Sequence, residues 1–179
     1  MKHKKIVAIG LIILSLALHV KAQQTILKPM ATPITTATIA EPKVAFKAAA
    51  TYVGGEPLAN NTESKVNFTG AYFDEGKNFS VVNGTFVAPS DGIYHFDLRV
   101  SWLQFSANGY VQLTLRTNLY AAIPASIILQ PSTTLPVFDS EFSTLLKLKT
   151  GDKIEVYLLQ KSGVQQKYQQ VQLSGFKVN

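Results

Sequence analysis

Four residues of the types that form a hydrolase triad stand close together in the segment APSDGIYHFDLRVSW, residues 88–102: Ser90, Asp91, His95 and Asp97. A triad needs a serine nucleophile, a histidine base and a carboxylate that orients the histidine. Ser90 and Asp91, however, lie in a Pro-Ser-Asp-Gly sequence, which is typical of a turn. The chain also lacks the Gly-x-Ser-x-Gly elbow that presents a nucleophilic serine. The segment therefore predicts a turn followed by a strand, and we expect no catalytic residues and no enzymatic activity.

The residues after this turn alternate between two faces, as in a half-buried β-strand. Successive side chains of a strand point in opposite directions, so His95, Asp97 and Arg99 share one face. Neighbours on that face are separated by about 6.6 Å along the strand. A direct hydrogen bond between His95 and Asp97 needs about 2.6–3.2 Å, so the spacing argues against it. The opposite face is apolar throughout, and we expect it in the core: Tyr94, Phe96, Leu98, Val100 and Trp102.

The chain is poor in the residues that bind metals. It contains no cysteine, and His95 is the only histidine left if the N-terminal segment is removed. Zinc and iron sites need clusters of such residues, so we expect no metal site of this kind and no cofactor. Asp74, Glu75 and Asn78 could offer oxygen ligands to calcium, but their spacing is not that of a known calcium loop, and a turn explains them.

The N-terminus predicts a signal peptide over residues 1–22. A lysine-rich start is followed by the apolar run 6–18, and Val20-Lys21-Ala22 offers small residues for cleavage after Ala22. The apolar run is too short to cross a bilayer comfortably, so we expect a secreted, extracellular chain with no transmembrane segment in its mature form. The next segment, residues 23–43, is rich in Thr, Pro and Ala and is expected to be an extended tail.

Removing the signal peptide changes the charge of the chain. The full chain carries a net charge of +6, but four lysines leave with residues 1–22, so thirteen Lys and Arg then face eleven Asp and Glu. The resulting +2 and the lack of a basic stripe make a nucleic-acid partner improbable.

Residues 44–179 read as a single all-β domain. Short alternating runs such as YVQLTLRTN and KIEVYLLQ are separated by turn signals, including Asn83-Gly84 and Thr150-Gly151-Asp152. No long amphipathic helix is visible. Many short strands at close spacing predict a β-sandwich or jelly roll held together by its hydrophobic core, because the chain has no disulfides.

A larger pattern surrounds the opening segment. Aromatic, acidic and glycine residues at fixed gaps resemble the signature of the C1q globular-head domain: Phe68, Asp74, Phe79, Phe86, Gly92, Tyr94 and Phe96. The last signature position, an aromatic residue in the family, is Leu98 here. The segment TGDKIEV and the closing Ser174-Gly175-Phe176 are also similar to the family's sequences. The resemblance covers the whole region from residue 44 onward.

This resemblance implies a ten-stranded jelly-roll β-sandwich of the kind shared with the tumour necrosis factor superfamily. It also implies a secreted, non-enzymatic recognition module that assembles as a homotrimer, here without a collagen-like stalk. Tyr157 and Leu159 lie on the face opposite Ile154, Val156 and Leu158, so this predicted strand is apolar on both faces. Either a second copy of the chain or a loop of the same chain must cover the outer face.

The ligand is expected to bind at loops, because loops carry recognition in this family. Two loops are candidates, and their side chains are Asn118 and Tyr120 in the first and Gln165, Gln166 and Tyr168 in the second. The ligand could be a protein or a glycan. Two alternatives remain open: a structural adhesin or matrix subunit, and a jelly-roll glycan hydrolase that uses a carboxylate pair.

Overall fold

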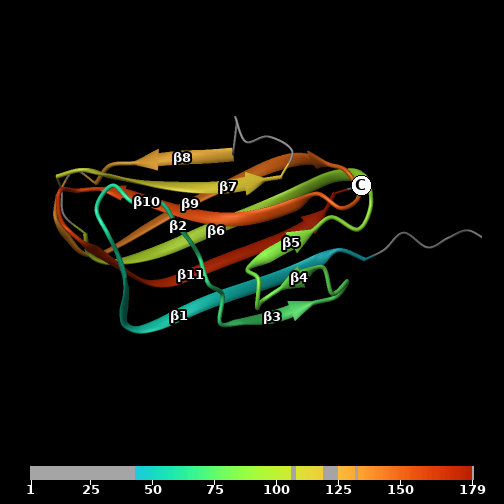
Figure 1. Cartoon of the computed structure of the whole chain (residues 1–179), viewed down its shortest axis with the longest axis horizontal. Helices are drawn as coiled ribbons and strands as arrows, with labels where there is room; N and C mark the ends of the chain where they lie inside the picture. The colour runs from blue at the N-terminus through green and yellow to red at the C-terminus, as the bar shows by residue number, and fades with distance from the viewer. Residues whose placement is uncertain (1–42, 106–107, 119–124, 132, 179) are drawn as a thin grey trace, which may run out of the picture. The chain divides into compact units, whose positions relative to one another are not determined.

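The alternating segments form β-strands that pair into two antiparallel sheets (Figure 1). A computed structural model describes residues 43–105, 108–118, 125–131 and 133–178. The expected signal peptide at 1–22 and nearly all of the expected tail at 23–43 lie outside these ranges and remain predictions.

The first sheet contains, in spatial order, β3 (Gly70–Asp74), β1 (Ala45–Leu58), β11 (Gln166–Lys177), β6 (Gly92–Phe105) and β9 (Leu135–Leu148). The second contains β4 (Phe79–Ser80), β5 (Thr85–Val87), β10 (Lys153–Lys161), β7 (Tyr110–Thr117) and β8 (Ala125–Leu129), with β2 (Ser64–Lys65) also paired to β10. We call them the five-stranded and the six-stranded sheet.

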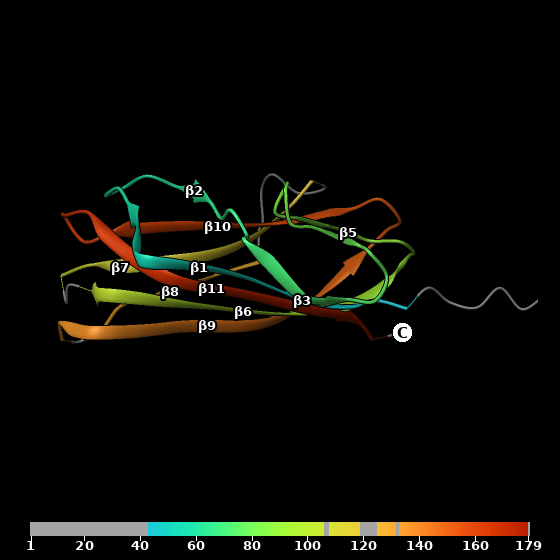
Figure 2. The same cartoon turned by 90° about the horizontal axis from the view of Figure 1, so that it is seen from below.

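The two sheets stack as layers, and the chain crosses between them repeatedly (Figure 2). Crossings join β1 to β2, β2 to β3, β3 to β4, β5 to β6, β6 to β7, β8 to β9, β9 to β10 and β10 to β11. This order of crossings is that of a jelly roll, which confirms the predicted fold class. The described residues form eleven strands, two of them only two residues long, where the resemblance implies ten.

Aromatic side chains fill the space between the sheets. The five apolar residues expected on the inner face of residues 94–102 are all buried, each with 1% of its surface exposed or less. The indole of Trp102 donates a hydrogen bond to the hydroxyl of Ser140 at 2.8 Å, so its polar atom is satisfied inside the core. The inward alternation of β6 is therefore confirmed.

Phe46 on β1 stacks at a ring-centroid distance of 5.1 Å on both Phe79 and Phe86. Gly175 on β11 lies beneath this cluster. A Cβ atom at that position would stand 2.7 Å from the ring of Phe46 and 2.8 Å from that of Phe96. Only glycine lets the strand approach the rings this closely, which explains the glycine of the closing Ser-Gly-Phe sequence.

The signature residues have structural positions. The aromatic ones, Phe68, Phe79, Phe86, Tyr94 and Phe96, are buried in the core, and Gly92 begins β6. The carboxylate of Asp74 accepts hydrogen bonds from the backbone N–H groups of Asn78 at 3.0 Å and Phe79 at 2.9 Å. Asp74 thus closes the turn that was weighed above as a calcium loop.

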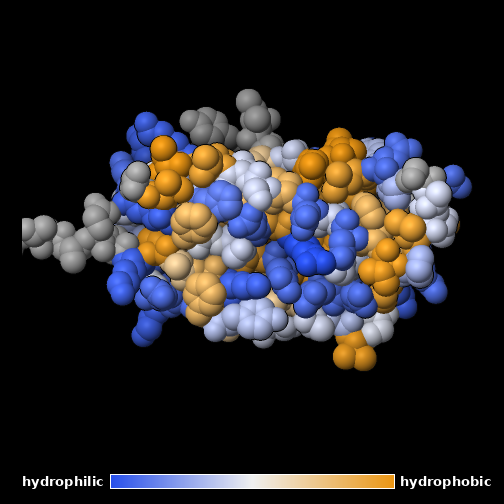
Figure 3. All heavy atoms as spheres, turned by 180° about the vertical axis from the view of Figure 1, so that it is seen from behind, coloured by the Kyte–Doolittle hydropathy of each residue, from blue (hydrophilic) through white to orange (hydrophobic). Residues whose placement is uncertain are grey.

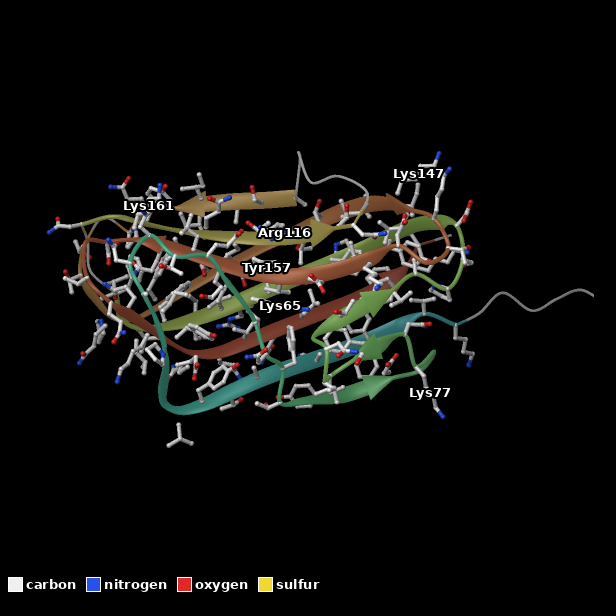
Figure 4. All side chains as sticks on the ribbon, in the orientation of Figure 1. Lys65, Lys77, Arg116, Lys147, Tyr157 and Lys161 are labelled. Atoms are coloured by element: carbon white, nitrogen blue, oxygen red, sulfur yellow. The ribbon has the colours of Figure 1, made fainter. Side chains whose placement is uncertain are left out.

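The segment between β1 and β3 runs beside β10, to which its strand β2 is hydrogen-bonded, and its charged side chains contact side chains of β10 and β7 (Figure 4). Lys65 Nζ contacts Glu155 Oε1 at 2.6 Å, and the guanidinium of Arg116 pairs with Glu63. Arg116 also lies over the ring of Tyr157, with its Cζ atom 3.9 Å from the centroid. Tyr157 and Leu159 are consequently only part exposed, and for Tyr157 the same chain supplies cover.

Candidate functional site

The residues that resemble a triad occupy different environments. The hydroxyl of Ser90 accepts a hydrogen bond from Lys177 Nζ at 3.1 Å, and its carbonyl accepts one from the hydroxyl of Tyr94 at 2.6 Å. Asp91 accepts hydrogen bonds from the backbone N–H of Thr150 at 2.9 Å and from its hydroxyl, and these hydrogen bonds lower the pKa of Asp91. Both residues therefore hold the turn before β6, as their sequence predicts.

His95 and Asp97 lie closer together than the strand spacing predicts, with 3.4 Å between His95 Nδ1 and Asp97 Oδ2. The two side chains lean toward each other, although Nδ1 makes no hydrogen bond with any described residue. Asp97 instead accepts a hydrogen bond from the hydroxyl of Ser143. The imidazole packs against the ring of Phe176 at a centroid distance of 5.0 Å. His95 is thus a packed residue of the sheet surface.

Exposed apolar side chains surround His95. By strand register, Leu145 lies opposite it on β9 and Phe176 opposite it on β11. Ile93 is next on the same face of β6, and its carbonyl accepts a hydrogen bond from the backbone of Val178 at 2.8 Å. Their exposed fractions are 44% for Ile93, 60% for Leu145, 46% for Phe176 and 43% for Val178. We call these four residues the apolar cluster.

The sequence predictions did not identify the apolar cluster. The signal was nevertheless available, because Leu145 and Leu146 are adjacent in a strand and must point to opposite faces. Leu146 packs against the core, so Leu145 points outward. What alternation could not tell is that outward residues of three strands lie side by side, because strand order is a property of the fold.

A hollow of about 520 Å³ lies beside the apolar cluster, on the same outer face of the five-stranded sheet. Figure 3 shows this face, with hydrophilic residues between hydrophobic groups. We call this hollow of about 520 Å³ the polar hollow. It is lined by Lys47, Asp97, Leu98, Arg99, Glu141, Phe142, Ser143, Gln172 and Ser174.

One cation of the polar hollow is neutralised by a carboxylate of β9. Arg99 Nη2 contacts Asp139 Oδ2 at 2.7 Å. The hydroxyl of Ser101 also donates a hydrogen bond to Asp139, and these two partners lower the pKa of Asp139 although partial burial opposes the shift. Lys47 and Glu141 differ, since neither forms an ion pair with a described residue.

The second loop candidate, with Gln165, Gln166 and Tyr168, contains both buried and exposed side chains. Gln166 and Tyr168 are each only 4% exposed, whereas Gln165 is exposed. The amide of Gln166 donates a hydrogen bond to the hydroxyl of Ser162 at 2.8 Å, and Tyr168 packs on Trp102 at 5.9 Å between centroids. Gln166 and Tyr168 therefore serve the fold, and only Gln165 of this set presents its side chain to solvent.

Buried Gln160 shapes the same loop from below. Its amide nitrogen donates hydrogen bonds to the carbonyls of Leu58 at 3.1 Å and Val164 at 2.9 Å. Its amide oxygen accepts from the backbone N–H of Ser162 at 2.9 Å and from the Ser162 hydroxyl at 2.8 Å. A fully bonded buried amide fixes the loop, so a ligand would meet a preformed surface.

A second hollow, of about 440 Å³, lies beside this loop. It is lined by Gly54, Leu103, Gln104, Pro136, Gln165, Gln166 and Lys167, and we call it the amide hollow. Gln104 is exposed and has a φ of 48°, in the left-handed region that few residues other than glycine adopt. It lies between Leu103, which pairs with Val137, and Phe105, which pairs with Leu135.

The first loop candidate is described only in part. Asn118 is exposed, and its side-chain oxygen accepts a hydrogen bond from the backbone N–H of Lys153 at 2.6 Å. This contact ties the end of β7 to the start of β10. Tyr120 lies outside the described residues.

The described residues contain no group of three or more His, Cys, Asp or Glu side chains that could hold a metal ion. Within the same ranges, no helix has the length and hydrophobicity to cross a bilayer.

Comparison with known proteins identifies similar domains. The model of the C1q domain family matches residues 45–178. The globular domain of zebrafish complement 1qA protein is 20% identical, aligns over 76% of this chain and 98% of its own, and gives a TM-score of 0.57. PRD1 vertex protein P5 is 17% identical over 77% of this chain and 98% of its own, with a TM-score of 0.58. Eiger TNF from S. frugiperda is 13% identical over 78% and 94%, with a TM-score of 0.54. No curated protein sequence gives a significant match.

Proposed function

Because the chain belongs to the C1q domain family, we propose that it is a secreted, non-enzymatic binding protein that acts as a homotrimer. The apolar cluster carries this proposal. Four side chains between 43% and 60% exposed lie together on one sheet face. Apolar groups that gather on a surface favour burial in an interface. A ring of identical copies would bury them on every protomer.

The proposed assembly leaves the loops beside the amide hollow free. The apolar cluster lies near the start of β6 at Ile93, whereas the amide hollow includes Leu103 and Gln104 near its end. Three copies joined at one end would present three preformed loops at the other. Such multivalency strengthens weak contacts with a repetitive protein or glycan surface without any new contact at each site.

The oligomeric state of residues 23–179 tests the proposal. We expect sedimentation velocity at micromolar concentration to give the mass of a trimer. Leu145→Asp places a charge in the apolar cluster and should yield a folded monomer, with the circular dichroism spectrum unchanged because Leu145 is exposed.

Ile128→Asp is the matched control. Ile128 is 58% exposed, close to the 60% of Leu145, but it lies on β8 of the six-stranded sheet. This variant should remain trimeric. A wild-type chain that is monomeric at all accessible concentrations contradicts the homotrimer, and a trimeric Leu145→Asp variant contradicts this choice of surface.

A further inference from the structure

The polar hollow holds one cation and one anion, Lys47 and Glu141, that form no ion pair with a described residue. Resting on the proposed homotrimer, we propose that neighbouring copies join head to tail, with Lys47 of one copy pairing with Glu141 of the next. The occupant of the polar hollow is thus a second copy of this chain, and the two residues determine which side of one copy meets which side of the next.

The other charges of the polar hollow already have partners. Arg99 pairs with Asp139 at 2.7 Å, and Asp97 accepts a hydrogen bond from Ser143. Lys47 Nζ lies 5.4 Å from the centroid of the Tyr72 ring, and Lys47 forms no ion pair with a described residue. Glu141 is exposed and lies opposite Arg99 in the strand register, where its charge acts on the guanidinium, but it forms no ion pair with a described residue because Asp139 holds Arg99. One cation and one anion are therefore left for a partner outside the protomer.

Lys47 and Glu141 cannot meet within one copy. Lys47 lies on β1 and Glu141 on β9, and the strands β11 and β6 lie between them. Three strand spacings of about 4.8 Å amount to roughly 14 Å, and the register places Lys47 level with Ser143, two residues from Glu141. The charges thus mark opposite sides of one sheet face.

Cyclic symmetry brings these two sides together. In a closed ring, each copy uses two different patches, and one patch contacts the other patch of the next copy. Glu141 is well placed for such a contact, because β9 is the terminal strand of its sheet in the described part of the chain. With Lys47 on the receiving side, the contact is electrostatically complementary, which selects partner and orientation.

Charge reversal tests the pairing. Lys47→Glu and Glu141→Lys should each weaken trimer formation by about tenfold or more, because like charges then face each other across the contact. The double variant Lys47→Glu/Glu141→Lys should restore assembly to within about threefold of the wild type, since the pair is present again with reversed sign. Lys153→Glu, a reversal at an exposed lysine of the six-stranded sheet, should have no effect on assembly.

Mixing provides a readout that a purely structural role would not change. Tagged wild-type chains should co-purify with wild-type chains but not with the double variant, because mixed contacts would oppose two lysines or two glutamates. The neutral variants Lys47→Gln and Glu141→Gln replace any reversal that fails to fold, and they should weaken assembly less than the reversals do. Circular dichroism and thermal melting monitor the fold of every variant.

The possible results separate this pairing from the proposed function. Trimers that form equally well with either single reversal, or a double variant no better than the singles, would overturn the Lys47–Glu141 pair while the homotrimer stands. A wild-type chain that never assembles would overturn both.

Discussion

His95 carries a buried side-chain nitrogen that has no hydrogen-bond partner among the described residues. Its ring packs on Phe176, and the carboxylate of Asp97 accepts a hydrogen bond from the hydroxyl of Ser143. Replacing an unsatisfied polar group by an apolar one of similar shape is close to neutral or stabilising. We therefore expect His95→Phe to change the free energy of unfolding by less than about 1 kcal/mol, or to raise it, in urea titrations.

His95→Phe also tests whether His95 forms a stabilising bond with Asp97. A loss of more than about 2 kcal/mol would mean that His95 and Asp97 form a bond that stabilises the fold. His95→Ser serves as the comparison, because it removes the ring and its contact with Phe176 and should destabilise the fold.

His95 also shows how much of a side chain's position could be predicted from the sequence. Alternation correctly predicted that His95 and Asp97 share one face and that Tyr94 and Phe96 lie on the opposite, buried face. It did not predict the 3.4 Å approach, because strand geometry fixes where Cα atoms lie while χ angles decide where side chains end. The Gln-rich composition of their segment predicted a loop at Gln166 and Tyr168. Both residues instead lie in β11, two positions apart and both buried.

At the scale of elements, the segment between β1 and β3 is held against β10 by charges. Burial raises the pKa of Glu155, but hydrogen bonds from Lys65 and Thr85 outweigh it, so the pKa lies below its ordinary value. A lowered carboxylate pKa contributes stability that is present above the ordinary pKa and is lost as the pH falls through the lowered value. The attachment of this segment is therefore predicted to be sensitive to acid.

Glu155→Gln tests this attachment. At pH 7 the variant should be less stable than the wild type by up to about 1 kcal/mol, a modest amount because Lys65 and Glu155 are both part exposed. The difference in urea midpoint should close as the pH falls through the lowered pKa of Glu155, because the wild-type carboxyl then becomes protonated. Glu75→Gln, at an exposed turn position, should show little difference at either pH. An equal gap at pH 7 and pH 3 would contradict the ionic attachment.

For the whole molecule, the spacing of seven residues was enough to predict the fold. The aromatic ones among them form the core cluster, and Asp74 closes a turn, so their spacing records contacts between strands that are far apart in the chain. The surface used for assembly could not be predicted in this way. The position of this surface depends on which outward-pointing residues become neighbours in the fold. It also depends on which of those residues are covered by other segments of the same chain.

Tyr157 illustrates that limit. From the sequence, the apolar outer face of β10 could be covered either by a second copy of the chain or by another segment of the same chain. Arg116 lies 3.9 Å above the Tyr157 ring and is held there by Glu63. The six-stranded sheet is thus partly covered from within, whereas no described segment covers the apolar cluster on the five-stranded sheet.

Tyr157→Ser should therefore leave the oligomeric state unchanged while it lowers the stability of each protomer. The loss of the cation–π contact and of part-buried ring surface should cost about 1–2 kcal/mol in urea unfolding. Sedimentation velocity should be measured for Tyr157→Ser and Leu145→Asp together. Tyr157→Ser changes the six-stranded sheet and Leu145→Asp the five-stranded sheet, so the comparison shows which sheet assembly uses. If Tyr157→Ser dissociates the protein while its circular dichroism stays native, assembly uses the six-stranded sheet. If it unfolds at lower urea but sediments with the wild type, Arg116 and Tyr157 act within the protomer, and the five-stranded sheet is left for self-association.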